Sequence, residues 1–244
     1  LVLNRKTGRV EHKIFRDVIN YLNPSDLLVF NDTKVFKARL HGKTTTGTKV
    51  EIFLIHPQGR DWLVMGRPGK KLQLDGEVKF AGGIVGKILR KHLDGSLEIH
   101  FNVSHQKLIM ATDKIGQVPV PPYINARPTL KQYQTVFAKH IGSVAAPTAG
   151  FHFTRELLAR LKNKGIRVKF ITLHVGLGTF QPIKTDRLED HPIHSEMASI
   201  TADTLKAIRN CRASRHRVIA VGTTTVRALE GLVTEKSLAT PKCQ

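Results

Sequence analysis

The feature that most constrains this chain is a series of short hydrophobic segments, separated by glycines, between Lys37 and Phe101. Apolar and polar residues alternate within the segments, which predicts strands with one buried face. The expected strands are Phe36–Leu40, Val50–Ile55, Trp62–Gly66, Glu77–Phe80, Ile84–Leu89 and Leu97–Phe101. Strands that are this short and this closely spaced predict a small antiparallel barrel or sandwich.

The flanking regions predict helices and strands in alternation. Leu27–Phe30 is a continuous apolar run, as expected of a strand buried on both faces. Thr154 and Thr201 are suited to cap helices. The expected elements are a short helix over Lys13–Tyr21, helices from Arg155 to Lys164, from Thr201 to Ala213 and from Val226 to Leu232, and strands over Ile166–Leu173 and Arg217–Val221. This order predicts an α/β fold with a mostly parallel sheet and covering helices.

The fold class is therefore α/β with an inserted antiparallel β-barrel domain. We expect residues 1–36 to form the first part of the α/β domain, residues 37–120 the barrel and residues 121–244 the second part. The Pro-rich stretch after Gln117 is expected to return the chain to the α/β domain. Both ends of the sequence are abrupt, which suggests a piece of a longer protein with its C-terminal part missing.

Composition limits the class of protein. Hydrophobic residues make up 41% of the 244, which is enough for a core, and the longest apolar runs are far too short to span a membrane. Cys211 and Cys243 are the only cysteines. A disulfide framework is not expected from two cysteines, and a reducing cytoplasm is the simplest location.

The charge is strongly positive. The chain has 39 Lys and Arg against 19 Asp and Glu, a formal net charge of +20. Eight basic and three acidic residues lie between Arg60 and Lys91, and five basic and no acidic residues between Lys206 and Arg217. The excess favours a nucleic-acid partner. The alternatives are a generally basic proteome, lost acidic segments or ordinary solvated faces.

Two short runs combine glycine, histidine and aromatic residues: Pro147–Thr154 and His174–Phe180. Glycine lets the backbone approach a ligand, histidine exchanges protons near neutral pH, and aromatic rings stack on bases. We therefore expect the two runs to form the walls of one pocket. The second run is not a dinucleotide-binding loop, because a third glycine is absent and Pro182 follows where a helix should begin.

The segment Gly222–Thr225 links a predicted strand to a predicted helix. Free N–H groups at the helix start, together with the threonine hydroxyls, suit a carboxylate or phosphate. Ordinary capping by threonine is the alternative. Asn31 and Asp32 end the first buried strand at the expected ligand edge of the sheet, and Arg39 follows as a possible anion-binding residue. A simple turn cap at Asn31 and Asp32 is again the alternative.

The densest group of titratable residues lies between Glu189 and Glu196. Asp190 could orient a histidine, and His191, His194 and Glu196 could supply a base and an acid. A structural network ranks second. A zinc site ranks third, because no cysteine is near and Pro192 makes a helical face improbable.

Several of these runs, taken in order, resemble one family. They are Asp26–Thr33, Pro121–Ile124, Tyr133–Val136, Ala145–Gly150, Leu173–Phe180, His194–Glu196 and Val221–Arg227. The chain is similar over nearly its whole length to the S-adenosylmethionine:tRNA ribosyltransferase-isomerases of queuosine biosynthesis. The order of the motifs makes the match far more specific than any one of them.

The resemblance implies an enzyme that moves the ribosyl part of S-adenosylmethionine onto 7-aminomethyl-7-deazaguanine at the tRNA wobble position. The ribose is isomerised to an epoxycyclopentanediol, which gives epoxyqueuosine, while adenine and methionine leave. S-adenosylmethionine is thus a consumed co-substrate, and no regenerated cofactor or metal is expected. The implied partners are the anticodon arms of tRNAs for Tyr, His, Asp and Asn. A cytoplasmic monomer is expected, with no membrane association.

The site residues that we expect on this basis fall into three groups. The catalytic candidates are His191, His194 and Glu196, and the RNA-binding candidates are Arg67, Lys70 and Lys71. The substrate-binding candidates are Asn31, Asp32, Arg39, Thr148, Gly150, His152, Phe153, His174, Gly176, Gly178, Thr179, Phe180, Thr223, Thr224 and Arg227. Within the last group, Phe153 and Phe180 are expected to stack on adenine, and Thr223 and Thr224 to hold the methionine carboxylate.

Two other functions compete with this hypothesis. A non-catalytic RNA-binding protein built on the barrel would explain the charge but not the histidine, glycine and threonine clusters. An S-adenosylmethionine-dependent RNA methyltransferase would use the same co-substrate, but the glycine-rich dinucleotide loop is absent.

Overall fold

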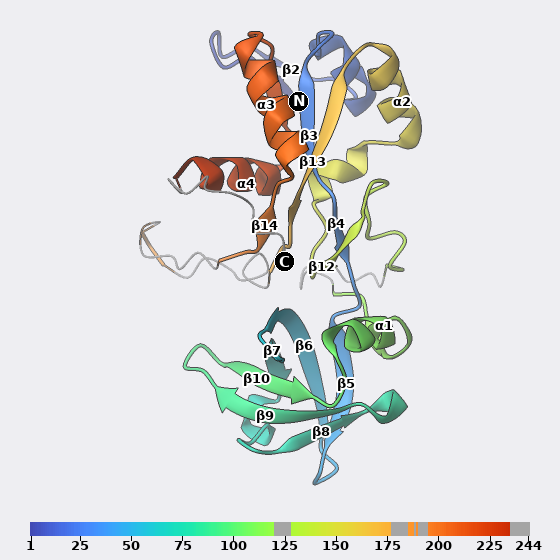
Figure 1. Ribbon diagram of the computed structural model, residues 1–244, viewed down its shortest axis with the longest axis vertical. Helices are drawn as coiled ribbons and strands as arrows, with labels where there is room; N and C mark the ends of the chain where they lie inside the picture. Colours follow the sequence, from blue (N-terminus) through green and yellow to red (C-terminus); the bar gives the residue numbers. More distant parts are fainter. Residues whose placement is uncertain (120–127, 177–184, 188, 190–194, 235–244) are drawn as a thin grey trace.

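The structure is a computed structural model, which describes residues 1–119, 128–176, 185–187, 189 and 195–234. Figure 1 shows two parts along the longest axis, a barrel below and a sheet with helices above. None of the described helices combines the length and the apolar character needed to cross a membrane.

The barrel is a closed, six-stranded antiparallel sheet. Its strands are β5 (Arg39–Thr44), β6 (Lys49–Gln58), β7 (Asp61–Arg67), β8 (Glu77–Phe80), β9 (Val85–Lys91) and β10 (Ser96–Phe101). Their order is β5-β6-β7-β10-β9-β8, and pairing of β8 with β5 closes the sheet. The predicted strands are confirmed, and glycine-containing turns join most of them. Buried and more exposed residues alternate along β5, β7 and β8, whereas β6 buries three residues in a row, Ile52–Leu54.

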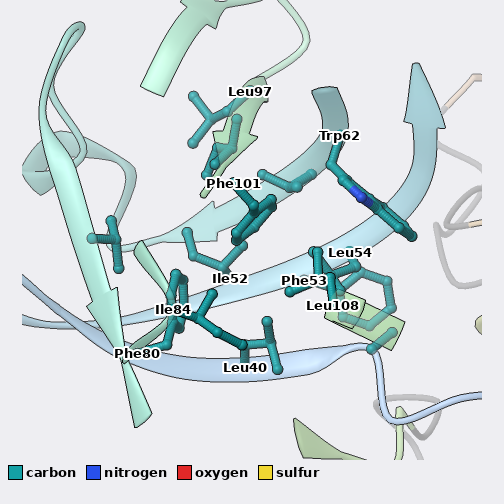
Figure 2. Packing of buried hydrophobic residues seen from close by; sticks show 14 of the residues in the cluster. Leu40, Ile52, Phe53, Leu54, Trp62, Phe80, Ile84, Leu97, Phe101 and Leu108 are labelled. Carbon is teal, nitrogen blue, oxygen red and sulfur yellow. The ribbon is translucent and has the colours of Figure 1, made fainter. Parts of the chain in front are cut away.

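The interior of the barrel is filled by the inward-facing residues of all six strands (Figure 2). Ile52, Leu54, Trp62 and Ile99 are almost fully buried there. Helix α1 (His105–Ile115) packs Leu108 into the same cluster. This helix is a difference from the sequence analysis, which assigned no element there. Figure 1 shows α1 on the side of the barrel that faces the α/β part.

The α/β part is built on a mixed sheet in the order β14-β13-β3-β15. Strands β3 (Leu27–Asn31), β13 (Arg167–Leu173) and β15 (Val218–Ala220) are parallel, whereas β14 (Ala198–Ser199) is antiparallel to β13. The described sheet is therefore mixed rather than uniformly parallel. Two further strands, β4 (Thr33–Val35) and β12 (His140–Ser143), pair in parallel beside it. The short pairs β1 (Val2–Leu3) with β2 (Val10–Glu11), and β11 (Gly116–Gln117) with β5, complete the strands.

Strand β3 is buried on both faces, as its apolar sequence predicts. Leu27 and Val29 face a cluster that includes Cys211 of α3 (Ala202–Ala213) and Ala228 of α4 (Thr223–Thr234). Leu28 and Phe30 face the opposite cluster, which contains residues of α2 (Arg155–Asn163) and of the 3-10 helix η1 (Phe15–Tyr21). The alternation of side chains along β3 thus produces a sheet with helices on both sides.

The threonine caps are confirmed. Thr154 accepts a hydrogen bond from the N–H of Leu157 at the start of α2, and Thr201 accepts one from the N–H of Thr204 at the start of α3. The barrel core is separate from the clusters on the two faces of the sheet. The division into an α/β domain and an inserted barrel, with the boundaries given above, remains a prediction.

The amino ends of β3 and β15 are joined by a bidentate ion pair. Arg217 Nε donates to Asp26 Oδ1 at 3.2 Å, and Arg217 Nη2 donates to Asp26 Oδ2 at 2.5 Å. Burial alone raises the pKa of the Asp26 carboxyl. The hydrogen bonds from Arg217 and Asn23, together with the charge of Arg217, outweigh burial, so the pKa of Asp26 lies below its ordinary value of 3.8.

We expect R217Q to lower the free energy of unfolding by about 2–4 kcal/mol at pH 7, because it leaves a buried carboxylate without its cation. Since the pKa of Asp26 is lower in the folded state, the stabilisation is present above pH 3.8 and is lost as the pH falls through the folded-state pKa. Denaturant unfolding at pH 7 and pH 3 measures both effects. R212Q, which removes an exposed arginine of α3, is the matched control. Equal stability of R217Q and R212Q would contradict the prediction.

Candidate active site

The candidate site lies where β3, β13 and β15 end. Because these strands are parallel, their carboxyl ends meet at one edge of the sheet, where ligands bind in this architecture. Asn31 closes β3, His174 follows β13, and Thr223 opens α4 after β15. The structure therefore brings together the three polar segments that the sequence analysis placed at this edge.

The side chain of Asn31 connects three segments at this edge of the sheet by hydrogen bonds. Its Nδ2 donates to the carbonyl oxygen of Leu173 at 2.9 Å and to Oγ1 of Thr224 at 3.3 Å. Its Oδ1 accepts from the N–H groups of Thr33 at 3.1 Å and Leu173 at 3.0 Å. The amide uses two donors and two acceptor positions, which is its full capacity. These contacts favour a positioning function for Asn31 over direct contact with a ligand.

Asp32 presents a buried carboxylate next to a histidine that the sequence analysis did not select. The residue is 7% exposed, and its Oδ1 accepts a hydrogen bond from Thr172 Oγ1 at 2.7 Å. Its Oδ2 lies 3.7 Å from Nε2 of His140. The backbone carbonyl of Asp32 accepts from the N–H of Lys139 at 2.8 Å, which holds the start of β12 against this point. The Asp32 carboxylate and the His140 imidazole are therefore within ion-pair distance of each other.

His174, which follows β13, contacts a buried hydroxyl group. Its Nδ1 lies 2.7 Å from Oγ1 of the fully buried Thr33. This contact fixes the ring orientation and leaves Nε2 as the nitrogen that is not bonded to Thr33. The backbone of Gly142 lies directly against the ring, because a Cβ atom there would be 2.7 Å from both Cε1 and Nε2 of His174. Only a residue without a side chain leaves the imidazole in this position.

The environment of His174 keeps its imidazole neutral. Burial lowers the pKa of His174 below the ordinary value of 6.5, and the nearby His140 lowers it further, while Asp32 raises it in part. A neutral imidazole can accept a proton at neutral pH. Among the predicted site residues that the structure describes, His174 thus has the properties expected of a proton acceptor.

Glu196 and Arg227 form an ion pair beside Gly176. Glu196 Oε1 accepts from the N–H of Gly176 at 2.9 Å, and its Oε2 accepts from Arg227 Nη1 at 2.7 Å. The side chain of Glu196 is 6% exposed, whereas that of Arg227 is 44% exposed. Both oxygens of Glu196 are engaged, which favours a function in holding Gly176 and Arg227. The guanidinium of Arg227 remains accessible to a ligand.

The segment that contains the 3-10 helix η4 (Thr148–His152) packs beside the start of α4. Gly222 has φ of +86°, and a Cβ there would lie 3.1 Å from that of Ala149. Gly150 is buried against Phe137 and Thr135, where a Cβ would be 2.8 Å from both side chains. Ala149 of this segment therefore lies beside the start of α4, and packing accounts for the glycine at position 150.

Of the two aromatic positions at the end of η4, Phe153 belongs to the core, whereas His152 is exposed. The ring of His152 stacks on Phe15 with centroids 4.8 Å apart. Phe153 is 3% exposed and makes edge contacts with Phe15 and Phe30 at 4.9 and 4.7 Å. The burial of Phe153 does not favour stacking on adenine, because aromatic neighbours already occupy its surroundings.

The remaining predicted residues do not join this cluster in the described part of the chain. Arg39 lies on β5 in the barrel, and its Nε is 3.8 Å from Glu51 Oε1. Arg67 ends β7, and Lys70 and Lys71 lie in the 3-10 helix η2 (Gly69–Lys71). The predicted positions outside the described residues are Gly178, Thr179, Phe180, His191 and His194. No group of three or more potential metal ligands occurs among the described residues.

The sequence analysis missed His140, Gly142 and Thr172. A signal was present in His140-Ile141-Gly142-Ser143, which combines a titratable residue with glycine as the two selected loops do. Its position next to Asp32 depends on the parallel pairing of β12 with β4, which no local pattern predicts. Ser143 adds to this arrangement, because its Oγ accepts from the N–H of Val175 at 2.9 Å.

The fold and the site together define an α/β protein with an antiparallel barrel and a polar site at the carboxyl ends of the parallel strands. A family model described as "Queuosine biosynthesis protein" matches residues 1–243. The chain therefore belongs to this family.

Curated relatives carry the name S-adenosylmethionine:tRNA ribosyltransferase-isomerase. Those of Thermotoga petrophila, Thermosipho africanus and Staphylococcus aureus are 45%, 46% and 43% identical over 231, 232 and 244 residues. Each match covers 94% of this chain and 68% of the relative. A crystal structure of S-adenosylmethionine tRNA ribosyltransferase from Thermotoga maritima is 31% identical, with a TM-score of 0.42, and the match covers 96% of this chain and 65% of that one. The chain thus spans about two thirds of the length of these proteins.

Proposed function

We propose that this chain acts as an S-adenosylmethionine:tRNA ribosyltransferase-isomerase. It transfers and isomerises the ribosyl part of S-adenosylmethionine onto the aminomethyl group of 7-aminomethyl-7-deazaguanine at the tRNA wobble position. Epoxyqueuosine forms, and adenine and methionine leave. The observation that carries the proposal is the neutral, partly buried His174, which contacts Thr33 beside Asp32 and His140, in a chain that is 43–46% identical to relatives of that name.

The methionine end of the co-substrate carries a carboxylate, which suits the start of α4. The first N–H groups of a helix lack partners within it and attract anions. Thr223 is exposed there, and Arg227 is one turn further along with an accessible guanidinium. We assign the carboxylate to these groups and to Thr224. The Thr225 hydroxyl is not included, because it donates to the carbonyl of Val221 at 2.8 Å.

The reaction needs a proton acceptor and a proton donor. A sulfonium makes the C5′ hydrogens of the ribose acidic, so a base beside C5′ starts the isomerisation, and protonated adenine is the better leaving group. We assign the base to His174, since its imidazole is neutral and oriented by Thr33. His191, His194 and Glu196 stay candidate acid–base residues from the sequence. The engaged oxygens of Glu196 place it last as a base.

The other substrate contacts follow the sequence prediction. Phe180 is proposed to stack on adenine, with Gly178 and Thr179 approaching the nucleoside through their backbone. Thr148, Gly150 and Gly176 line the pocket. The proposal takes the complete α/β sheet to be mostly parallel, so that all of these loops meet at its carboxyl edge. A site closed to water would protect the charged intermediates.

The proposed RNA partners are the anticodon arms of tRNAs for Tyr, His, Asp and Asn. The chain is proposed to work as a cytoplasmic monomer, without a regenerated cofactor. Lys and Arg residues would hold the tRNA through its phosphates, and such binding weakens steeply as salt rises.

Product analysis tests the proposed function. The protein is incubated with S-adenosylmethionine and tRNA that carries 7-aminomethyl-7-deazaguanine, and the small-molecule products are separated by chromatography. We expect adenine and methionine in equal amounts, each dependent on the tRNA. S-adenosylhomocysteine would instead identify a methyltransferase. Failure to bind S-adenosylmethionine in equilibrium dialysis would leave the non-catalytic RNA-binding protein as the better account.

A further inference from the structure

A cavity with basic walls lies on the barrel, outside the candidate active site. Its volume is about 980 Å³. Strands β5, β6 and β8 and the end of β7 supply its walls, whose basic side chains are Lys43, Lys49, Arg67 and Lys79. Figure 1 shows the turn between β5 and β6 at the end of the barrel away from the α/β part.

Three of these cations lie side by side in the sheet. Lys43 of β5 is directly opposite Lys49 of β6 and directly opposite Lys79 of β8. Neighbouring strands are about 4.8 Å apart, so the three lysines form a short row across the barrel surface. All three side chains are exposed. Like charges in directly opposed positions destabilise a sheet, and an anion bound between them would offset the repulsion.

The carboxylates near the row are already opposed by other cations. Glu51, the acidic residue of the cavity wall, has its Oε1 3.8 Å from Arg39 Nε. Glu77 is opposite Lys87 in the pairing of β8 with β9. Among the described residues, no carboxylate lies within 4.0 Å of the charged groups of Lys43, Lys49 or Lys79. The cavity therefore keeps an uncompensated positive charge.

We propose that this cavity, with Lys43, Lys49, Arg67 and Lys79 in its walls, is a binding surface for the phosphodiester backbone of the substrate tRNA, remote from the site of chemistry. The inference rests on the proposed function and names where the barrel contacts the RNA. Lysine is a flexible point charge without the forked geometry that reads bases, so the row suits phosphates and not a particular sequence. A cavity of about 980 Å³ is also far larger than a single phosphate ion.

The proposal modifies the prediction made from sequence. Arg67 lines the cavity, whereas Lys70 and Lys71 do not. Lys43, Lys49 and Lys79 are the additional residues. The β5–β6 hairpin places Lys43 opposite Lys49, and closure of the barrel between β5 and β8 brings in Lys79, which is 36 positions from Lys43 in the chain.

The test compares the full-length chain with K43Q/K79Q. Filter binding of tRNA is measured between about 50 and 200 mM salt, together with kcat and KM. We expect roughly tenfold weaker tRNA binding at the lower salt and a slope of log affinity against log salt that is less steep by about 1–2, since two phosphate contacts are lost. KM for tRNA should rise, whereas kcat and KM for S-adenosylmethionine should stay the same.

K107Q/K114Q is the matched control, because it removes two exposed charges from α1, which do not line the cavity. If K107Q/K114Q weakened tRNA binding as much as K43Q/K79Q, the binding would depend on the overall positive charge of the protein, and the proposal would be overturned. Unchanged tRNA affinity in K43Q/K79Q would overturn it as well. Binding of inorganic phosphate to these lysines without any loss of tRNA binding would also overturn the proposal, since this outcome identifies a small-anion site. If the wild-type chain binds tRNA through these lysines but forms no epoxyqueuosine, the proposed function is wrong, whereas the proposed tRNA-binding surface is supported.

Discussion

We expect H174N to lower kcat/KM for tRNA modification by about 10²–10⁴-fold, the usual contribution of a positioned acid–base group. Asparagine can keep a hydrogen bond to Thr33 Oγ1, now 2.7 Å from His174 Nδ1, but it cannot accept a proton at the position of Nε2. The fold should be preserved, because the His174 side chain contributes one polar contact and no core packing. Single-turnover kinetics with saturating S-adenosylmethionine measures the loss.

H216N is the control, since His216 is an exposed histidine after α3. It should retain the wild-type rate. Equilibrium dialysis should find that H174N still binds S-adenosylmethionine. A turnover rate of H174N close to that of H216N would remove His174 from the mechanism and return the acid–base function to His191 or His194.

The pH dependence of the same variant gives a second readout. Because burial and His140 lower the pKa of His174, its neutral form should persist below the ordinary value of 6.5, and the acidic limb of kcat/KM should fall below that pH. The unfolded chain binds the proton more readily, so stability is full above about pH 6.5 and decreases as the pH falls below it. H174N should lose this part of the stability profile.

We expect G142A to lower kcat by about 10²-fold, although residue 142 has no group that could take part in the chemistry. A Cβ at this position would lie 2.7 Å from Cε1 and Nε2 of His174, so the imidazole must move away from its place beside Thr33. Displacement of a catalytic group by about 1 Å is sufficient for a loss of this size. Steady-state kinetics with tRNA measures it.

G69A is the matched control for G142A, because a Cβ at Gly69 of the barrel meets no atom within 4 Å. Thermal unfolding separates displacement of His174 from general loss of structure. We expect G142A to unfold cooperatively and to bind S-adenosylmethionine. Wild-type kcat in a folded G142A would show that the contact between the glycine and the imidazole has no part in catalysis.

The sequence predicted the barrel well, because its strands follow a local rule. In β8, the buried Val78 and Phe80 alternate with the exposed Glu77 and Lys79, and such alternation is sufficient to define a strand. Helix α1 was not predicted, since Leu108 and Thr112 are its only buried residues and leave a weak periodic signal. The boundary of β13 differs from the prediction by a single residue, at Arg167.

The candidate site was predicted in its location but not in its internal contacts. Polar residues at the ends of apolar runs, such as Asn31 and His174, indicated the correct edge of the sheet. The contact of Asp32 with His140 was not predictable, because it joins residues 108 positions apart through a pairing that only the folded chain defines. Phe153 was assigned to the ligand pocket but lies in the core, since an aromatic residue in a glycine-containing run suits either place equally well in sequence.

The central claim is that the cluster around His174 performs ribosyl transfer to tRNA. Mass spectrometry of the anticodon fragment, after incubation with S-adenosylmethionine and nuclease digestion, tests it most directly. The account predicts that the wild-type chain and H216N convert 7-aminomethyl-7-deazaguanine to epoxyqueuosine, while H174N leaves the base unchanged over the same period. An unmodified base with the wild-type chain, or a methylated one, would contradict the account.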